Sequence, residues 1–153
     1  MSTDTPGEAD ANRGALEPDP KAIAEIDRLN QECRARPGEI EPQIALWRAV
    51  TALDFWVGIN RGTPEAPRPY MLAAEAGAML CVFSSATRAK EAAEANGLIA
   101  AGDPVPLFVV PLPAALDWAM SFGEHGVTGV TIDYPRLGAW CPLPNLAGLR
   151  RDR

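Results

Sequence analysis

The stretch PYMLAAEAGAMLCVFSSATRA, residues 69–89, decides the fold of this chain. Apolar residues dominate both 70–74 and 78–83, and the short link between these runs predicts a β-hairpin. Residues 78–83 are apolar on both faces, as in a central strand. Ser84 or Ser85 then suits the N-cap of a helix, so the stretch predicts a strand–strand–helix unit.

Two helices and a strand are predicted before this unit. Asp19-Pro20 is typical of a helix start. The thin apolar stripe of that helix places it, within residues 19–38, on the outside of the domain or against a partner. A second helix begins near residue 41, and Ile44 and Trp47 belong to its helical spacing. Residues 55–59 then alternate in polarity and predict a strand.

The remaining elements follow the unit. Residues 105–110 and 127–133 predict strands, and residues 113–123 between them predict a buried helix. The proline-rich end beyond residue 133 predicts irregular structure. The element order is therefore ααβββαβαβ. We expect an α/β (α+β) fold in which helices pack on one mixed five-stranded sheet, with its first three strands forming an antiparallel meander.

Composition sets limits on the class of protein. The chain has 153 residues and a net charge of −6, so we expect no nucleic-acid partner. There is no apolar run of transmembrane length and no secretory signal, which predicts a cytoplasmic protein without a membrane contact. Twelve of the basic residues are Arg, as in GC-rich bacterial genomes. Residues 1–18 predict a flexible acidic tail, 39–147 the α/β domain and 148–153 a basic end.

The chain resembles the SseB N-terminal domain family, named after an enhanced-serine-sensitivity phenotype. The resemblance spans residues 46–146 and is clearest at 69–89, where a strand ends in Val-Phe-Ser-Ser before a helix. Residues 106–135 repeat the family's order of strand, buried helix, Gly-rich turn and strand. Where the family often closes with Asn-Pro-Gly, this chain has Asp133-Tyr134-Pro135-Arg136. The resemblance implies the fold and no reaction, and it depends on residues 78–83 and 105–110 sharing one sheet.

The start of the third helix is a candidate ligand site. Free N–H groups at a helix start, hydroxyl groups and an Arg together suit a carboxylate or phosphate. The alternative is simple N-capping by a serine, worth about 1 kcal/mol. The candidate ligand-binding residues are Ser84, Ser85, Thr87, Arg88 and, at the end of the last strand, Arg136.

No catalytic motif is found, so we expect no enzyme and no cofactor. His125 is the single histidine, and Cys33, Cys81 and Cys141 match no metal-binding spacing. A hydrolase or thiol enzyme would need His125 within reach of Cys81 or Cys141. The sequence therefore favours buried, reduced thiols and predicts no metal site.

The four tryptophans suggest a protein contact. Trp47 and Trp118 fit helical core positions, whereas Trp56 and Trp140 are candidates for an exposed contact patch, together with Tyr134. We therefore expect a non-enzymatic module that binds an unknown protein partner or self-associates. A small-molecule or anion sensor at residues 84–88 is the alternative.

Overall fold

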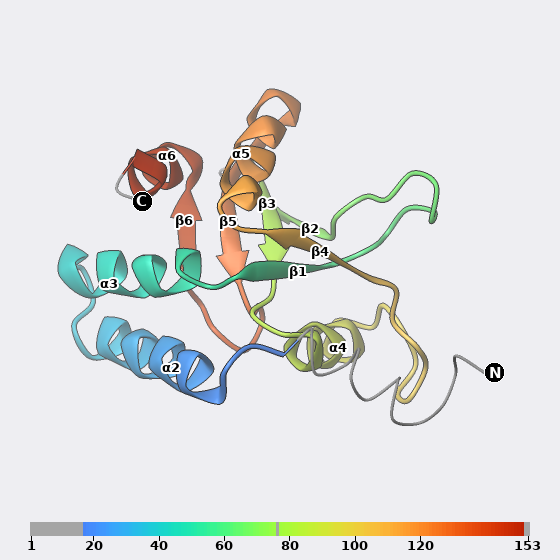
Figure 1. Cartoon of the computed structure of the whole chain (residues 1–153), viewed down its shortest axis with the longest axis horizontal. Helices are drawn as coiled ribbons and strands as arrows, with labels where there is room; N and C mark the ends of the chain where they lie inside the picture. Colours follow the sequence, from blue (N-terminus) through green and yellow to red (C-terminus); the bar gives the residue numbers. More distant parts are fainter. Residues whose placement is uncertain (1–16, 76, 152–153) are drawn as a thin grey trace.

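The computed structural model describes residues 17–75 and 77–151 and has a mixed α/β fold (Figure 1). The predicted tail, residues 1–18, lies almost wholly outside the described residues, as does the very end of the basic C-terminus. Within the described residues the helices are α2 (Pro20–Ala35), α3 (Ile40–Thr51), α4 (Ala86–Ala95), α5 (Ala114–Ser121), the short 3-10 helix η1 (Phe122–His125) and α6 (Leu143–Arg151). The strands are β1 (Phe55–Ile59), β2 (Met71–Ala74), β3 (Gly77–Val82), β4 (Leu107–Pro111), β5 (Val127–Ile132) and β6 (Trp140–Pro142).

The predicted single sheet is wrong, because the described strands form two sheets. One has the order β2-β3-β5-β6, in which β3 and β5 are parallel and the outer pairs are antiparallel. The other is the antiparallel pair β1-β4. An isolated bridge, with reciprocal hydrogen bonds of 2.9 and 2.8 Å between Val57 and Phe83, joins the two sheets at one corner.

The predicted antiparallel meander of β1, β2 and β3 does not form, because β1 does not pair with β2. The hairpin β2-β3 forms as predicted, and β3 is central. Strand β2 occupies one edge of β3 up to Cys81, whose N–H donates to the carbonyl of Tyr70 at 3.0 Å. Strand β1 therefore reaches that edge only at Phe83, and it pairs along its whole length with β4 on its other side.

The C-terminal segment is more regular than its prolines suggest. Residues 140–142 form an edge strand on β5, and residues 143–151 form a helix, where the sequence predicts irregular structure. The prolines do not oppose this arrangement. Pro142 ends the short strand, and Pro144 lies in the first turn of α6, where a missing N–H costs no hydrogen bond.

Two apolar clusters lie on opposite sides of β1 and β3. Successive side chains of β1 belong to different clusters. Trp56 lies in the cluster formed with α2, α3, α5 and α6, and Val57 lies in the cluster under α4. Small residues of α4 (Ala89, Ala92 and Ala93) allow close approach to the strands. Ile26 of α2 is also fully buried in the larger cluster, so the thin stripe of that helix faces this chain's own core.

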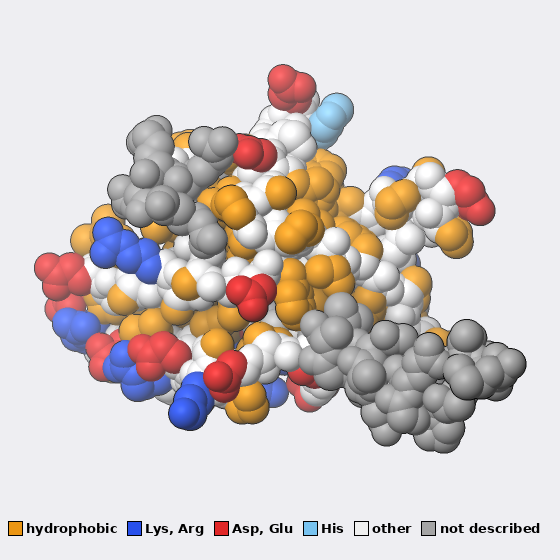
Figure 2. Space-filling model, viewed as in Figure 1, with side chains coloured by type: hydrophobic (Ala, Val, Ile, Leu, Met, Phe, Trp, Pro, Cys, Tyr) orange, Lys and Arg blue, Asp and Glu red, His pale blue; other side chains and the backbone are white. Residues whose placement is uncertain are grey.

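Charged and apolar side chains gather on different parts of the visible face (Figure 2). Acidic and basic side chains lie over α2 and α3, where Arg28 and Arg36 form ion pairs within and beside α2. Hydrophobic side chains lie over β1, β4 and α5. Among residues 17–75 and 77–151, none of the helices has both the length and the apolar character that a bilayer crossing requires.

Candidate functional site

The predicted anion site is built around the start of α4. The hydroxyl of Ser85 accepts a hydrogen bond from the N–H of Arg88 at 3.1 Å, which confirms an N-cap at this position. Ser84 donates its N–H and its hydroxyl to the two carboxylate oxygens of Asp133, at 2.7 and 2.6 Å. Thr87 donates both its N–H and its hydroxyl to Glu17. The donors of Ser84 and Thr87 are therefore bound to carboxylates of the same chain.

Arg88 completes this buried network. It is only 7% exposed, and it donates to Asp133 at 2.9 Å and to Asp27 of α2 at 2.6 Å. Burial by itself would lower the pKa of Arg88, but the hydrogen bonds and charges of Asp27 and Asp133 outweigh it and raise that pKa. The guanidinium therefore stays charged and joins α2, α4 and the end of β5. The carboxylate of Asp133 lies where the sequence predicts an external anion.

Arg136 does not join this network. Its exposed guanidinium pairs with Glu91 of α4 at 3.3 Å. Arg136, Arg88 and Tyr134 line a shallow pocket of about 200 Å³ beside α4. The charge of Arg136 is thus balanced at the surface, separately from the buried pair.

The thiols and the histidine are not brought together. Cys81 and Cys141 are buried, and desolvation raises the pKa of Cys81 to about 11 and that of Cys141 to about 12. No hydrogen bond or ion pair among the described residues joins His125 to a thiol or carboxylate. In the same part of the chain, no three His, Cys, Asp or Glu side chains are grouped to hold a metal ion. Raised thiol pKa values disfavour the reactive thiolate.

The two candidate contact tryptophans have opposite environments. Trp56 is fully buried, and its indole N–H donates to the carbonyl of Val50 at 3.1 Å, so its predicted exposure is wrong. Both faces of β1 are covered by other elements, so the alternation of polarity along that strand does not distinguish an exposed face from a buried one. Trp140 is 45% exposed on the edge strand β6.

Trp140 belongs to an apolar groove between α3 and α6, which we call the Trp140 groove. It has a volume of about 280 Å³. Ile40 is 64% exposed and Ile44 is 39% exposed, and both line it with Trp140. The other lining residues are Gln43, Trp47, Arg48, Cys141, Pro142, Asn145, Gly148 and Leu149. Three of the four large hydrophobic side chains that the described residues expose therefore meet here.

A glycine positions the Trp140 ring. Gly129 of β5 lies under the indole, and a Cβ at Gly129 would lie only 2.7 Å from Cε3 of Trp140. The missing side chain lets the ring lie against the β5 backbone and helps hold it at the groove. An edge strand that begins with an exposed, supported indole suits recognition by packing.

The fourth exposed hydrophobic side chain lies elsewhere. Val109 is 38% exposed on β4, which pairs only with β1 among the described strands. Its neighbour Phe108 lies on the other face of the strand, where Phe108 and Trp118, and Trp118 and Phe122, pack edge to face with ring centroids 5.8 and 5.3 Å apart. Val109 therefore serves as a comparison position, away from the three exposed side chains that line the groove.

Sequence reasoning found one part of the groove and missed the rest. The sequence makes Trp140 a candidate, but it groups Ile44 with Trp47 in one helical spacing and does not single out Ile40. The signal that was present is the spacing of Ile40 and Ile44, which lie one turn apart on a face of α3 adjacent to the Trp47 face. Their partners on β6 and α6 are about a hundred residues away, so no local pattern shows that these residues meet.

Comparison with known proteins adds no relative: no family model, no curated protein and no solved structure matches this chain. The resemblance to the SseB N-terminal domain stays a prediction. The strands on which it depends, β3 and β4, lie in separate sheets, so the topology does not support it.

Proposed function

We propose that this chain is a non-enzymatic protein-binding module that docks a partner in the Trp140 groove. The observation that carries the proposal is the meeting of Ile40, Ile44 and Trp140, all exposed, around one hollow. Burying a side chain of this size stabilises a complex by about 1.5–3 kcal/mol. Clustered exposed apolar side chains with a polar rim are typical of interaction sites.

The shape of the groove favours an amphipathic helix from a different protein. Its walls are the two helices α3 and α6, and its base includes the buried Trp47 and the β6 residues Cys141 and Pro142. Gln43 and Asn145 supply polar groups among the apolar lining. Two helical walls and an aromatic anchor match recognition of a helix by apolar side chains spaced about one turn apart.

Site-specific crosslinking in cells tests this proposal. A photoreactive phenylalanine derivative replaces Ile44 or, as the matched control of nearly equal exposure, Val109 of the full chain. We expect one defined heterologous partner to be captured at position 44 and lost when Trp140→Ser is added, with no capture of that partner at position 109.

Three results would contradict the proposal. Capture that is equal at positions 44 and 109, or stronger at 109, would move the contact to β4. Capture at 44 that is insensitive to Trp140→Ser would show that the groove does not hold the partner. A concentration-dependent dimer in sedimentation that Ile44→Asp abolishes would identify a second copy of this chain as the occupant.

The alternative, an anion sensor at residues 84–88, requires a rearrangement. Ser84 and Arg88 would have to release Asp133 before they could bind an external anion. An added phosphate would compete with a carboxylate that is already held by three hydrogen bonds. The satisfied donors therefore favour the groove over this helix start.

A further inference from the structure

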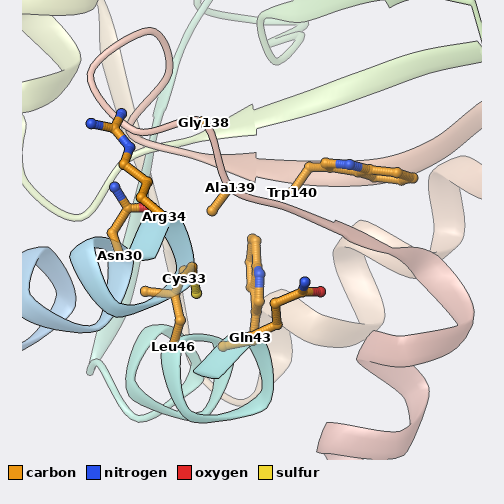
Figure 3. Close-up of a pocket in the computed structure, with 9 residues that line it drawn as sticks. Asn30, Cys33, Arg34, Gln43, Leu46, Gly138, Ala139 and Trp140 are labelled. Atoms are coloured by element: carbon orange, nitrogen blue, oxygen red, sulfur yellow. The ribbon is translucent and has the colours of Figure 1, made fainter. Parts of the chain in front are cut away.

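A second hollow adjoins the Trp140 groove and differs from it in chemistry. It has a volume of about 300 Å³, at the lower end of the range for small-ligand sites. Figure 3 shows Asn30, Cys33 and Arg34 of α2 on one side and Gly138 and Ala139 opposite. Gln43, Leu46, Trp47 and Trp140 complete it. We call it the Asn30 pocket.

Asn30 has an unusual environment for a carboxamide. Its side chain is only 4% exposed, lines the pocket, and makes no hydrogen bond within the described part of the chain. Its amide atoms are not among the fully buried side-chain atoms that lack a hydrogen bond, so they open onto the hollow of the pocket. The amide therefore points to a group that enters the pocket and binds it.

The charge of the pocket indicates the kind of group. Arg34 is the one charged residue among the nine that line it, and no carboxylate is among them. The neighbouring ion pairs of α2 belong to Arg28 and Arg36, which bind Glu25, Glu32 and Glu39. In Figure 3 the Arg34 guanidinium lies beside the Asn30 amide, toward the segment that carries Gly138. An anion on this side would receive hydrogen bonds from both groups.

The rest of the pocket is suited to an apolar body. Trp47 and Trp140 are shared with the Trp140 groove, and Leu46 is buried beneath them. Burial raises the pKa of Cys33, with a smaller opposing effect of Arg36, so its thiol adds no negative charge near neutral pH. A flat or branched apolar group fits against these side chains, while its charged end lies at α2.

We propose that the Asn30 pocket binds a small organic carboxylate. Arg34 and Asn30 hold the carboxylate, and the indoles of Trp47 and Trp140 contact its apolar part. The two hollows share Gln43, Trp47 and Trp140, but the proposal can be tested apart from the docked partner, because Ile40 and Ile44 line only the groove. A ligand and a partner would nevertheless both touch Trp140.

Chemical-shift titration of the full chain with benzoate tests the proposal, with benzamide as the uncharged match. At concentrations up to about 10 mM, the range suited to so small a probe, benzoate should shift the Asn30 side-chain amide and the Trp47 indole N–H. Benzamide should shift them at least about tenfold less, because it forms no charged hydrogen bond with Arg34. Arg34→Gln should weaken benzoate binding by a similar factor, and Arg28→Gln, on the same helix outside the pocket, should not.

A second variant separates binding from folding. Asn30→Leu should abolish the benzoate response of the Trp47 indole and leave the melting temperature unchanged or raised, because the Asn30 side chain makes no hydrogen bond within the described residues that the fold would lose. No response of Asn30 and Trp47 to benzoate, an equal response to benzamide, or binding that persists in Arg34→Gln would overturn the proposal. Ile44→Asp should leave benzoate binding unchanged while it disrupts partner docking, so the two proposals fail separately.

Discussion

Two polar centres touch helix α2, and they differ in how their groups are satisfied. At one, Arg88 joins Asp27 of α2 to Asp133, so one buried cation pairs with two carboxylates, and Oδ1 of Asp27 is left without a hydrogen bond. At the other, the amide of Asn30 makes no hydrogen bond within the described residues and opens, beside Arg34, onto a hollow. Residues only one turn apart on α2 thus belong to a closed structural network and to an open candidate site. Satisfied donors hold the fold together, whereas unsatisfied ones next to a cavity indicate binding.

In the network of Ser84, Arg88 and Asp133, the Asp133 carboxylate takes the place of the external anion that the sequence predicts. Asp133 has a left-handed backbone with φ of 55°, which places its carboxylate against Ser84 and Arg88 at the end of β5. Aspartate tolerates that conformation better than most residues. The network therefore fixes α4 and α2 relative to β5, and its loss should affect stability rather than binding.

The largest expected effect comes from breaking that network. Asp133→Ala leaves Arg88 buried with half of its partners and strains the left-handed position. We expect the free energy of unfolding to fall by about 3–5 kcal/mol in urea denaturation. Asp133→Asn, which keeps the shape and the backbone tolerance, should cost less. A loss below about 1 kcal/mol for Asp133→Ala would mean that the network is not structural.

Two tryptophan substitutions sharpen the comparison between buried and open sites. Trp56→Phe removes the hydrogen bond to Val50 and leaves a void, so the free energy of unfolding should fall by about 2 kcal/mol. Trp140→Phe alters an exposed ring and should change it by no more than about 0.5 kcal/mol. Equal losses in urea denaturation would place Trp140 in the core and weaken its role in docking.

Alkaline pH should destabilise the fold through its buried thiols. Unfolding returns Cys81 and Cys141 from pKa values of about 11 and 12 to an ordinary value of 9.0. The unfolded state then binds fewer protons than the folded state, so their contribution is intact below pH 9 and is lost as pH rises toward 12. The urea midpoint should therefore fall above about pH 9. Cys141→Ala should reduce that fall, and a midpoint that rises with pH would contradict this account.

The smallest expected effect is that of added phosphate at the closed network. A ligand that binds only the folded state raises the melting temperature. Because Ser84 and Arg88 already bind Asp133, we expect phosphate to leave the melting temperature unchanged. Any small rise should be the same in the Arg88→Met variant. Such a shift in a thermal scan would restore the anion-sensor hypothesis and reverse the distinction between the two centres.

Local patterns predict the elements of this fold and fail where pairing is distant. The hairpin 71–82, its capped helix and strand 55–59 are read correctly, because capping and alternation act over a few residues. The long partner of β1 is β4, about fifty residues further along the chain, and β2 leaves only Phe83 of the β3 edge for β1, so no local pattern predicts this pairing. The Trp140 groove is not predicted from the sequence for the same reason, since Ile40 and Trp140 are a hundred positions apart.

The central claim is that the Trp140 groove, and not the network around Arg88, is the part of this chain that recognises a partner. The yield of photocrosslinking at position 44 in cells tests it most directly, compared with and without Trp140→Ser in chains of matched unfolding free energy. We predict one heterologous crosslinked partner that disappears with Trp140→Ser. An unchanged yield in the Trp140→Ser chain would contradict the claim.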